Sequence, residues 1–342
     1  MELPKLQSAI QIICYSQGSS FDGLQIKQIP VPSEVPEGGV LVRTILRPVN
    51  PTDLIAIRGI RPAAFRGTLP ATVGSEGLGV VVECGAGVTK FTKGQRVVGG
   101  PWPSIFESQG TWQQYLVVSA DNLFAVPDGV SDKDASQFFV NPVTVYGMLD
   151  RHKIREGEWL LQTAAGSALG RQMIVMAKLR GIKTINVVRR TAQKAQLIDL
   201  GADEVISSQD EDLVQRVMEI TGGKGAWAAT DCCGAETTQQ VVNAVRPGGK
   251  VFIYGQFASN QMVLDIMDLL LYDKRVVGFQ LGFWVRSLSP ADKEAKFTEI
   301  LDLMAKGVFQ FQNGESYPLE CVKEALLAAE QPGRSGKVFL EG

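Results

Sequence analysis

Two patterns of apolar and polar positions divide the chain near residue 128. Before that point, short apolar runs lie between glycine and proline residues, a pattern typical of strands joined by tight turns. The clearest runs predict strands at 40–45, 77–83 and 95–99. Because proline is poorly tolerated inside a helix, we expect few helices in this first part.

From residue 128 onward, short apolar runs alternate with segments whose apolar residues recur at helical spacing. This alternation favours a parallel sheet whose strands are joined by crossover helices. The expected strands are 159–163, 184–188, 204–206, 226–231, 251–254 and 275–281. Six strands in this arrangement make a complete doubly wound, dinucleotide-binding fold of the Rossmann type.

Start and stop signals place the helices between these strands. One helix begins near Ala168 and ends at Gly181, and the next is capped by Thr191 and ends at Gly201. Further helices are expected over 210–220 and near 293–306.

The tail of the chain, 307–342, has the same pattern of apolar and polar positions as the first part. We expect it to return to the β-rich domain and complete that domain. The predicted organisation is therefore a β-rich domain made of 1–127 and 307–342, with a Rossmann domain, 128–306, inserted in it. The fold class is α/β.

The inventory of metal-binding residues is small. The chain of 342 residues has one histidine and five cysteines. No C-x-x-C pair occurs, and the odd number and wide scatter of the cysteines argue against a disulfide framework. We expect free thiols and a reducing, cytoplasmic location, and we expect the one histidine, His152, to lie on the surface.

Charge and hydropathy exclude two classes of partner. The formal net charge is −2 and the longest basic run is Arg189-Arg190, so nucleic acid is not expected as a partner. No apolar stretch approaches the roughly 20 residues that span a bilayer, and the first residues carry no secretion signal pattern, so no membrane association is expected.

A candidate phosphate-binding turn follows the first strand of the second part. When this turn is aligned with the pattern G-x-G-x-x-G, the three glycine positions are occupied by Ala165, Ser167 and Gly170. Small residues still allow a tight turn and a helix whose first N–H groups face a pyrophosphate. The alternative is a small-residue turn that binds nothing.

The end of the next strand indicates which dinucleotide would bind. An NAD site offers Asp or Glu there to the ribose hydroxyls, whereas this chain has Arg189-Arg190. Guanidinium groups bind phosphate bidentately, so this pair favours NADPH over NADH. Lys194, one helical turn on, could assist. The alternative is a solvated pair of arginines.

Five short motifs stand at intervals along the chain: Asn50-Pro51-Thr52-Asp53, Gly74-Ser75-Glu76-Gly77, Lys93-Gly94-Gln95-Arg96-Val97, Leu200-Gly201-Ala202-Asp203 and Arg246-Pro247-Gly248-Gly249. In this order they resemble the markers of the medium-chain dehydrogenase/reductase superfamily over nearly the whole chain. The resemblance implies a Rossmann domain inserted in a GroES-like barrel domain. Segments 140–146 and 184–189 look most like the zinc-free 2-enoyl thioester reductases, with the quinone oxidoreductases close behind.

The zinc-dependent alcohol dehydrogenases of this superfamily differ at their ligand positions. Asn50 stands where they have their first cysteine ligand, and Ser75 stands where they have a histidine beside Glu76. Residues 85–231 contain no cysteine, although the four-cysteine structural loop would lie there. The resemblance therefore implies the metal-free branch.

The resemblance also implies which residues contact the cofactor. An asparagine and a threonine near the nicotinamide match Asn141 and Thr144. The phosphate-binding turn matches Gly166, Ser167, Ala168 and Leu169, and the 2′-phosphate segment matches Arg189, Arg190 and Thr191. The two loops over the nicotinamide match Tyr254, Gly255, Gln256 and Phe257, and then Phe279, Gln280 and Leu281. A lysine near the C-terminus matches Lys337. For Phe279 and Leu281 the alternative is plain core packing, and for Lys337 it is a plain surface position.

One departure from the enoyl reductases concerns the proton. Those enzymes carry a tyrosine, thought to donate it, between the two motifs that contain Asp53 and Glu76. Residues 54–73 here contain no tyrosine. The proton at the α-carbon would have to come from another acid or from water.

Three functions remain open. The leading one is an NADPH-dependent, metal-free reductase of quinones or small α,β-unsaturated carbonyl compounds. The others are an enoyl thioester reductase, acting on acyl-CoA or acyl-carrier protein, and an NADPH-binding protein without turnover. The expected partner is a small-molecule electron acceptor, and the resemblance implies a homodimer formed by pairing of the last strand, 275–281.

Candidates for contact with the acceptor are Asn50, Thr144, Phe65, Trp102 and Phe257, which are expected to face the cleft between the domains. A backbone amide or a hydroxyl would polarise the acceptor carbonyl, and the aromatic rings would stack on a flat acceptor. Packing of the barrel wall is the equal alternative for the aromatic residues.

Overall fold

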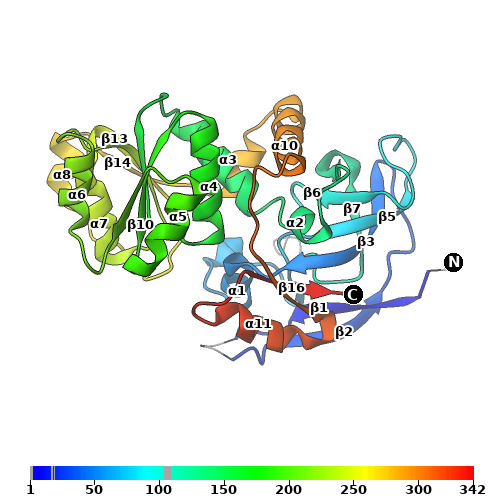
Figure 1. Ribbon diagram of the computed structural model, residues 1–342. Coiled ribbons are helices and arrows are strands. Elements are labelled where there is room, and N and C mark those ends of the chain that lie inside the picture. Colours follow the sequence, from blue (N-terminus) through cyan, green and yellow to red (C-terminus); the bar gives the residue numbers. More distant parts are fainter. Residues whose placement is uncertain (1–2, 17, 19, 104–108) are drawn as a thin grey trace. The chain divides into compact units, whose positions relative to one another are not determined.

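The computed structural model describes residues 3–16, 18, 20–103 and 109–342, which form two compact units (Figure 1). One unit consists of residues 141–289, and the other combines the chain up to residue 140 with the chain from residue 290. The boundaries differ from the predicted ones at 127/128 and 306/307, because helices α2 (Asp132–Ser136) and α10 (Pro290–Ala305) belong to the discontinuous unit.

The unit of residues 141–289 is built on a parallel six-stranded sheet. Its order is β11-β10-β9-β12-β13-β14, so the direction of winding reverses between β9 and β12. The predicted doubly wound fold is therefore confirmed. The strands are β9 (Trp159–Gln162), β10 (Lys183–Val188), β11 (Glu204–Ser207), β12 (Ala226–Asp231), β13 (Val245–Ile253) and β14 (Arg275–Gly278).

Helices cover both faces of this sheet. Figure 1 shows α4 and α5 on one face and α6 and α7 on the other. Apolar side chains such as Leu161, Ile185, Val217 and Val241 fill the space beneath α6 and α7. The helices of the unit are α3 (Asn141–His152), α4 (Ala168–Leu179), α5 (Lys194–Leu200), α6 (Leu213–Ile220), α7 (Ala235–Ala244), α8 (Ile266–Leu271) and α9 (Leu281–Arg286).

Local capping explains where the prediction was right and where it was wrong. Gly201 ends α5 with a left-handed φ of 107°, as expected. Thr191 does not cap that helix: it lies in a short 3-10 helix, and its hydroxyl donates to Asp210. The predicted helix 210–220 begins only at Leu213, because the Asp212 side chain accepts from the helix N–H of Gln215 at 2.9 Å.

The last strand is also shorter than predicted. It ends at Gly278, and Leu281 is already the first residue of α9. The Gln280 side chain causes this change, since it accepts from the backbone N–H of Phe283 and caps the helix.

In its described residues, the discontinuous unit has two sheets. A seven-stranded sheet has the order β15-β16-β3-β5-β6-β8, with β7 paired to β3, and a three-stranded sheet has the order β2-β1-β4. The tail returns as predicted, since β16 pairs antiparallel with β3. The strands are β1 (Leu6–Ile12), β2 (Leu24–Pro30), β3 (Gly39–Pro48), β4 (Ala71–Thr72), β5 (Leu78–Cys84), β6 (Arg96–Gly99), β7 (Tyr115–Ser119), β8 (Leu123–Ala125), β15 (Asn313–Pro318) and β16 (Lys337–Glu341).

Few helices occur in this unit, in line with its prolines. They are α2 and α10 together with α1 (Pro51–Ile57), which starts at Pro51, and α11 (Val322–Glu330). Ring contacts join α10 to the barrel, where Phe297 lies 5.3 Å from Phe124 and 5.7 Å from Phe138 between ring centroids. These contacts explain why α10 packs as part of the discontinuous unit.

His152 corrects an expectation. It was expected on the surface, but it is 7% exposed and its ring lies 3.9 Å from that of Phe252. Burial is the main cause that lowers the pKa of His152 to about 3, so the imidazole is neutral at physiological pH.

No helix in the described ranges is both long and apolar enough to cross a lipid bilayer.

Candidate functional site

The turn after β9 has the geometry that a phosphate-binding turn requires. Ala164 has a positive φ of 49°, and the chain then reaches Ser167, whose Oγ accepts from the N–H of Gly170 at 3.1 Å and caps α4. At Gly170 an added Cβ would lie 2.6 Å from the Cα of Ala165. Close packing of helix on strand is the role of the third glycine in dinucleotide-binding turns, and Gly170 meets it.

The first residues of α4 present N–H groups with a partial positive charge. Ala168 and Leu169 are at the N-terminus of a helix of 12 residues, and Gly166 precedes it. Such a terminus stabilises an anion in front of it. This part of the unit can therefore hold a pyrophosphate, as the turn predicted.

Two exposed arginines follow β10. Arg189 and Arg190 are both solvent-accessible, and the backbone oxygen of Arg189 accepts from the Ser207 hydroxyl at 3.3 Å. The neighbouring side chains are already engaged: Thr191 donates to Asp210, and Lys194 forms an ion pair with Glu211. The two arginines thus supply the positive charge at this strand end.

A buried carboxylate marks the point where the winding reverses. Asp231, the last residue of β12, is 0% exposed. It accepts hydrogen bonds from Thr163 Oγ1 at 2.6 Å, Thr238 Oγ1 at 2.6 Å, the backbone N–H of Cys233 at 3.0 Å and that of Gly234 at 3.4 Å. These bonds fix the chain after β12 against the chain after β9. Asp231 was not among the predicted site residues, although its place at the end of a predicted strand was a signal.

The chain after β13 supplies the first of the two predicted nicotinamide loops. The hydroxyl of Tyr254 is buried, whereas Phe257 is 56% exposed. The N–H of Phe257 donates to the oxygen of Cys232 at 2.7 Å, so this loop lies beside the end of β12.

The residues of the second predicted nicotinamide loop, 279–281, differ in their exposure. Phe279 is 5% exposed and its ring lies 5.7 Å from that of Phe252, so the packing alternative describes its side chain. Gln280 is exposed, and Leu281 is half-buried at the start of α9.

Asn141 and Thr144 lie one turn apart at the beginning of α3. Each is 8% exposed. Their side chains therefore keep only a small accessible surface.

A chain of hydrogen bonds runs through the interior of the discontinuous unit. Lys337 Nζ donates to Asn50 Oδ1 at 2.7 Å, and Asn50 Nδ2 donates to Glu76 Oε1 at 2.8 Å. The other carboxylate oxygen, Glu76 Oε2, accepts from the backbone N–H of Val140 at 2.7 Å. Lys337 is 5% exposed and the other two side chains 1%, so the surface alternative for Lys337 is wrong.

A second carboxyl group lies beside this chain. Asp53 Oδ2 accepts from the backbone N–H of Asn50 at 2.9 Å, at the start of α1. Burial raises the pKa of Asp53 to about 6 and that of Glu76 to about 7, while burial lowers the pKa of Lys337. The donors around Glu76 match its ionised form, because both oxygens accept.

Two aromatic candidates lie in different surroundings. Phe65 is 41% exposed in a short 3-10 helix, Ala63–Phe65, whereas Trp102 is 3% exposed in the apolar core of the barrel with Val97 and Leu116. Wall packing, the alternative left open above, describes Trp102.

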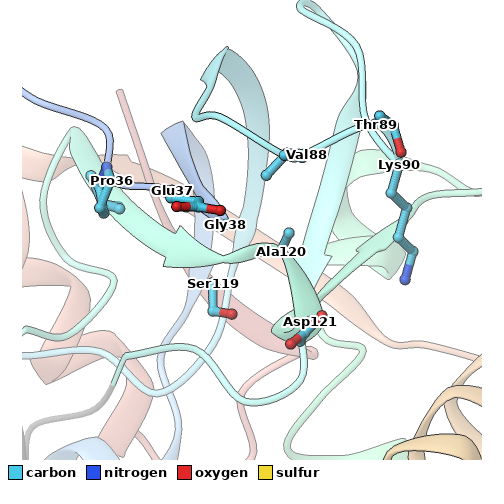
Figure 2. A pocket seen from close by; sticks show the side chains of 12 residues that line it. Pro36, Glu37, Gly38, Val88, Thr89, Lys90, Ser119, Ala120 and Asp121 are labelled. Atoms are coloured by element: carbon cyan, nitrogen blue, oxygen red, sulfur yellow. The ribbon is translucent and has the colours of Figure 1, made fainter.

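An open cavity lies elsewhere on the discontinuous unit. It has a volume of about 550 Å³ and is lined by residues 36–39, 87–90, 117 and 119–121 (Figure 2). The side chains of Glu37, Lys90 and Asp121 stand around it. It contains none of the predicted contact residues, so it is separate from the candidate site.

At the positions where the zinc-dependent alcohol dehydrogenases have zinc ligands, the side chains of this chain are either engaged in hydrogen bonds or of another type than the ligand. Asn50 bonds to Lys337 and Glu76, and Ser75 stands beside it in place of a histidine. Within the described part of the chain, no three His, Cys, Asp or Glu side chains are grouped as a metal site would require.

Comparison with known proteins places this fold and these turns in a family. The description "Alcohol dehydrogenase GroES-like domain" matches residues 36–128, and "Zinc-binding dehydrogenase" matches residues 168–306. The mitochondrial enoyl-acyl-carrier-protein reductase of Bos taurus is 30% identical over 306 residues, which cover 88% of this chain and 80% of that protein.

Two solved structures are similar over almost the entire chain. A Bacillus thuringiensis protein described as an NADPH:quinone reductase is 30% identical, with a TM-score of 0.90, and the match covers 98% of this chain and 99% of that one. A quinone oxidoreductase of Pseudomonas syringae is 26% identical, with a TM-score of 0.86, and the match covers 98% and 100%. The chain belongs to the medium-chain dehydrogenase/reductase superfamily.

Proposed function

We propose that this protein is a metal-free reductase that uses NADPH to reduce a quinone or the C=C bond of a small α,β-unsaturated carbonyl compound. The observation that carries the proposal is the exposed pair Arg189-Arg190 after β10, next to a turn and helix N-terminus fit for a pyrophosphate. The names of the similar proteins, which include NADPH:quinone and enoyl reductases, support it.

The residues present fit NADPH. The N-terminus of α4, with Gly166 to Leu169 around it, would hold the pyrophosphate, and Arg189, Arg190 and Thr191 would surround the 2′-phosphate. Within the unit of residues 141–289, Asn141, Thr144 and the loops 254–257 and 279–281 would contact the nicotinamide half. When bound, the cofactor supplies the hydride, and the protein supplies position and electrostatics.

The chain's own residues would orient the acceptor and exclude water. The hydroxyl of Thr144 is our candidate to polarise the acceptor carbonyl, with Phe257 as an exposed ring that would stack on a flat acceptor. Asn50 would act mainly by holding Lys337 and Glu76, since both ends of its amide are engaged. Without a tyrosine in 54–73, the proton that completes reduction of a C=C bond would come from another acid or from water.

Reduction of an enoyl thioester is the second candidate. The enoyl-acyl-carrier-protein reductases among the relatives favour it, and the missing tyrosine disfavours it. Binding of NADPH without turnover is the third candidate, and the retained turn and arginine pair do not by themselves separate it from the others.

One screen separates the three. NADPH oxidation would be followed with a quinone, a short enal and an enoyl-CoA at equal concentrations, after NADPH binding has been measured by fluorescence. We expect turnover with the quinone or the enal. Turnover with the thioester alone would overturn the ranking, and binding without any turnover would support the third candidate.

We further propose that two copies associate through the open edge of the six-stranded sheet. Segment 263–272, which contains α8 and comes before the edge strand β14, carries several accessible apolar side chains, a surface typical of an interface. They are Val263 (65% exposed), Ile266 (73%), Leu270 (70%), Leu271 (66%) and Tyr272 (51%).

A reducing, cytoplasmic compartment is the proposed location, because all five cysteines are free thiols. The mitochondrial names of several relatives make that organelle the alternative, which a fluorescent fusion would distinguish.

A further inference from the structure

The two carboxylate oxygens of Asp231 bind different parts of the chain. Oδ2 accepts from Thr238 Oγ1 at 2.6 Å and from the N–H of Gly234 at 3.4 Å, both at the start of α7. Negative charge at a helix N-terminus is stabilising, so these two bonds are those of a helix cap. Oδ1 accepts from Thr163 Oγ1 at 2.6 Å and from the N–H of Cys233 at 3.0 Å. The bond from Thr163 comes from a different strand, and capping of α7 does not require it.

Thr163 stands directly before the phosphate-binding turn. It is 0% exposed, and the next residue, Ala164, has a positive φ of 49°. A left-handed conformation is unfavourable for a residue other than glycine, and it persists only where neighbouring contacts hold it. The Thr163 hydroxyl is fixed twice, since it donates to Asp231 and accepts from the N–H of Cys232 at 3.1 Å. These two bonds hold the residue from which the turn starts.

The segment after β12 also holds the first predicted nicotinamide loop and the residues that follow it. The backbone oxygen of Cys232 accepts from the N–H of Phe257 at 2.7 Å. The backbone oxygen of Cys233 accepts from the N–H groups of Ala258 and Ser259 at 2.9 and 3.1 Å. The buried carboxylate at the end of β12 therefore links the phosphate-binding turn to this loop, and all of these residues belong to one compact unit.

We propose that Asp231 is a positioning residue for the dinucleotide, because through the Thr163 hydroxyl it holds the phosphate-binding turn and the loop 255–259 in one fixed relation. The affinity for NADPH then depends on the hydrogen bond between Thr163 and Asp231, although neither side chain has to touch the cofactor. Groups that are already in place bind a ligand more tightly, because no ordering has to accompany binding. The inference rests on the proposed function only for the identity of the ligand.

One pair of variants and a matched control isolate this hydrogen bond. Thr163→Val removes the hydroxyl and keeps the shape of the side chain, whereas Thr163→Ser keeps the hydroxyl. Thr221→Val is the control, since Thr221 Oγ1 also makes two buried bonds: it donates to the oxygen of Val217 at 2.7 Å and accepts from the N–H of Gly225 at 2.9 Å. Gly225 directly precedes β12, so this control lies at the opposite end of the strand from Asp231.

The first measurement is hydrogen–deuterium exchange of the backbone amides, followed by mass spectrometry on the intact protein without nucleotide. In Thr163→Val we expect exchange at least about threefold faster than in the wild type over 164–170 and 255–259. Thr163→Ser and Thr221→Val should match the wild type in both segments. Unchanged exchange of both segments in Thr163→Val would overturn the proposal.

The second measurement is nucleotide affinity, with NADPH and adenosine 2′-monophosphate as the two probes. Thr163→Val should weaken NADPH binding about 5- to 20-fold and leave the smaller probe, which lacks the pyrophosphate and the nicotinamide, within about twofold of the wild type. Thr163→Ser should restore NADPH affinity. An equal loss of NADPH affinity in Thr221→Val would contradict the positioning role, because affinity would then follow stability and not this hydrogen bond.

The two measurements together separate this inference from the proposed function. A wild-type protein that does not bind NADPH, with the expected exchange in Thr163→Val, would count against the proposed function and leave the link between the two segments standing. A wild-type protein that binds NADPH no more tightly than Thr163→Val does would instead overturn the positioning role and leave the cofactor assignment intact.

Discussion

The side chains of Asp53 and Glu76 show how single buried groups shape this protein. Each carboxyl group accepts a backbone N–H, and Asn50 and Lys337 complete the network around Glu76. The network joins α1, the loop before β5, β16 and Val140, which immediately precedes Asn141. Its groups therefore hold the segment from which the proposed nicotinamide contacts emerge.

Stability should depend on the protonation of Asp53. Burial raises its folded-state pKa from 3.8 to about 6, so the folded state binds the proton more tightly than the unfolded chain does. This contribution to stability is complete below pH about 4 and is lost as the pH rises through 6. In Asp53→Asn the contribution is absent, so the wild type should lose on the order of 2 kcal/mol relative to the variant over this range.

Urea unfolding at pH 4, 5, 6 and 7 measures this difference. Asp302→Asn, on the exposed side of α10, is the control and should parallel the wild type. Parallel curves for the wild type and Asp53→Asn would contradict the raised pKa.

Arg189 tests the phosphate assignment. Arg189→Glu replaces a charge that would bind the 2′-phosphate by one that repels it, so NADPH affinity should fall about 10- to 100-fold while NADH affinity changes little. Calorimetric titration of both nucleotides gives the ratio, and Lys27→Glu, on exposed β2, controls for the change in net charge. Equal losses for NADPH and NADH would rule out a phosphate clamp at Arg189.

At the scale of elements, the turn from β9 into α4 depends on close packing. Helix propensity alone predicts that Gly170→Ala stabilises α4, since alanine is favoured inside helices by up to about 1 kcal/mol. The distance of 2.6 Å from an added Cβ to the Cα of Ala165 predicts instead that the variant is less stable, because a backbone atom there cannot move away without disturbing the turn. We expect a net loss of roughly 1–3 kcal/mol in thermal or denaturant unfolding.

A glycine in open space provides the comparison for that variant. An added Cβ at Gly278 would meet nothing within 4 Å, and its φ is not in the left-handed region. Gly278→Ala should therefore leave stability nearly unchanged. A stabilised Gly170→Ala would mean that the helix and strand are not packed as closely as described.

Sequence patterns predicted the elements whose signals are local. Alternation of strand and helix predicted all six parallel strands, and Gly201 predicted the end of α5. The side-chain caps Asp212 and Gln280 moved two boundaries, because a polar residue near a predicted edge can cap the helix one turn later. The expected surface position of His152 was wrong. A polar residue in the last turn of a helix is expected to be exposed unless its packing partner, here Phe252, is known.

Contacts distant in the chain account for what the sequence did not reveal of the site. Lys337 was singled out only by resemblance, and its partner Asn50 lies 287 positions earlier. The sequence spacing of the residues predicts neither the hydrogen-bond network around Glu76 nor the one around Asp231. Each network forms only when separate strands come together.

At the scale of the molecule, the proposed association through α8 and β14 can be tested with one charge. Leu270→Glu places a carboxylate on a side chain that is 70% exposed, so it should cost the monomer little and weaken a dimer strongly. Light scattering across a range of concentrations would detect the change to monomer. Leu327→Glu, on α11 at 50% exposure, is the matched control and should remain dimeric. A wild-type protein that is monomeric at all concentrations would contradict the proposal.

The proposed hydride transfer from NADPH needs no metal, in a protein whose zinc-ligand positions hold Asn50 and Ser75. The most direct measurement is NADPH oxidation with a quinone acceptor, on protein treated with a chelator and analysed for bound zinc. We predict that turnover persists at substoichiometric zinc and is not increased by adding zinc. Loss of turnover on chelation, with recovery when zinc is restored, would instead show that the reaction depends on zinc.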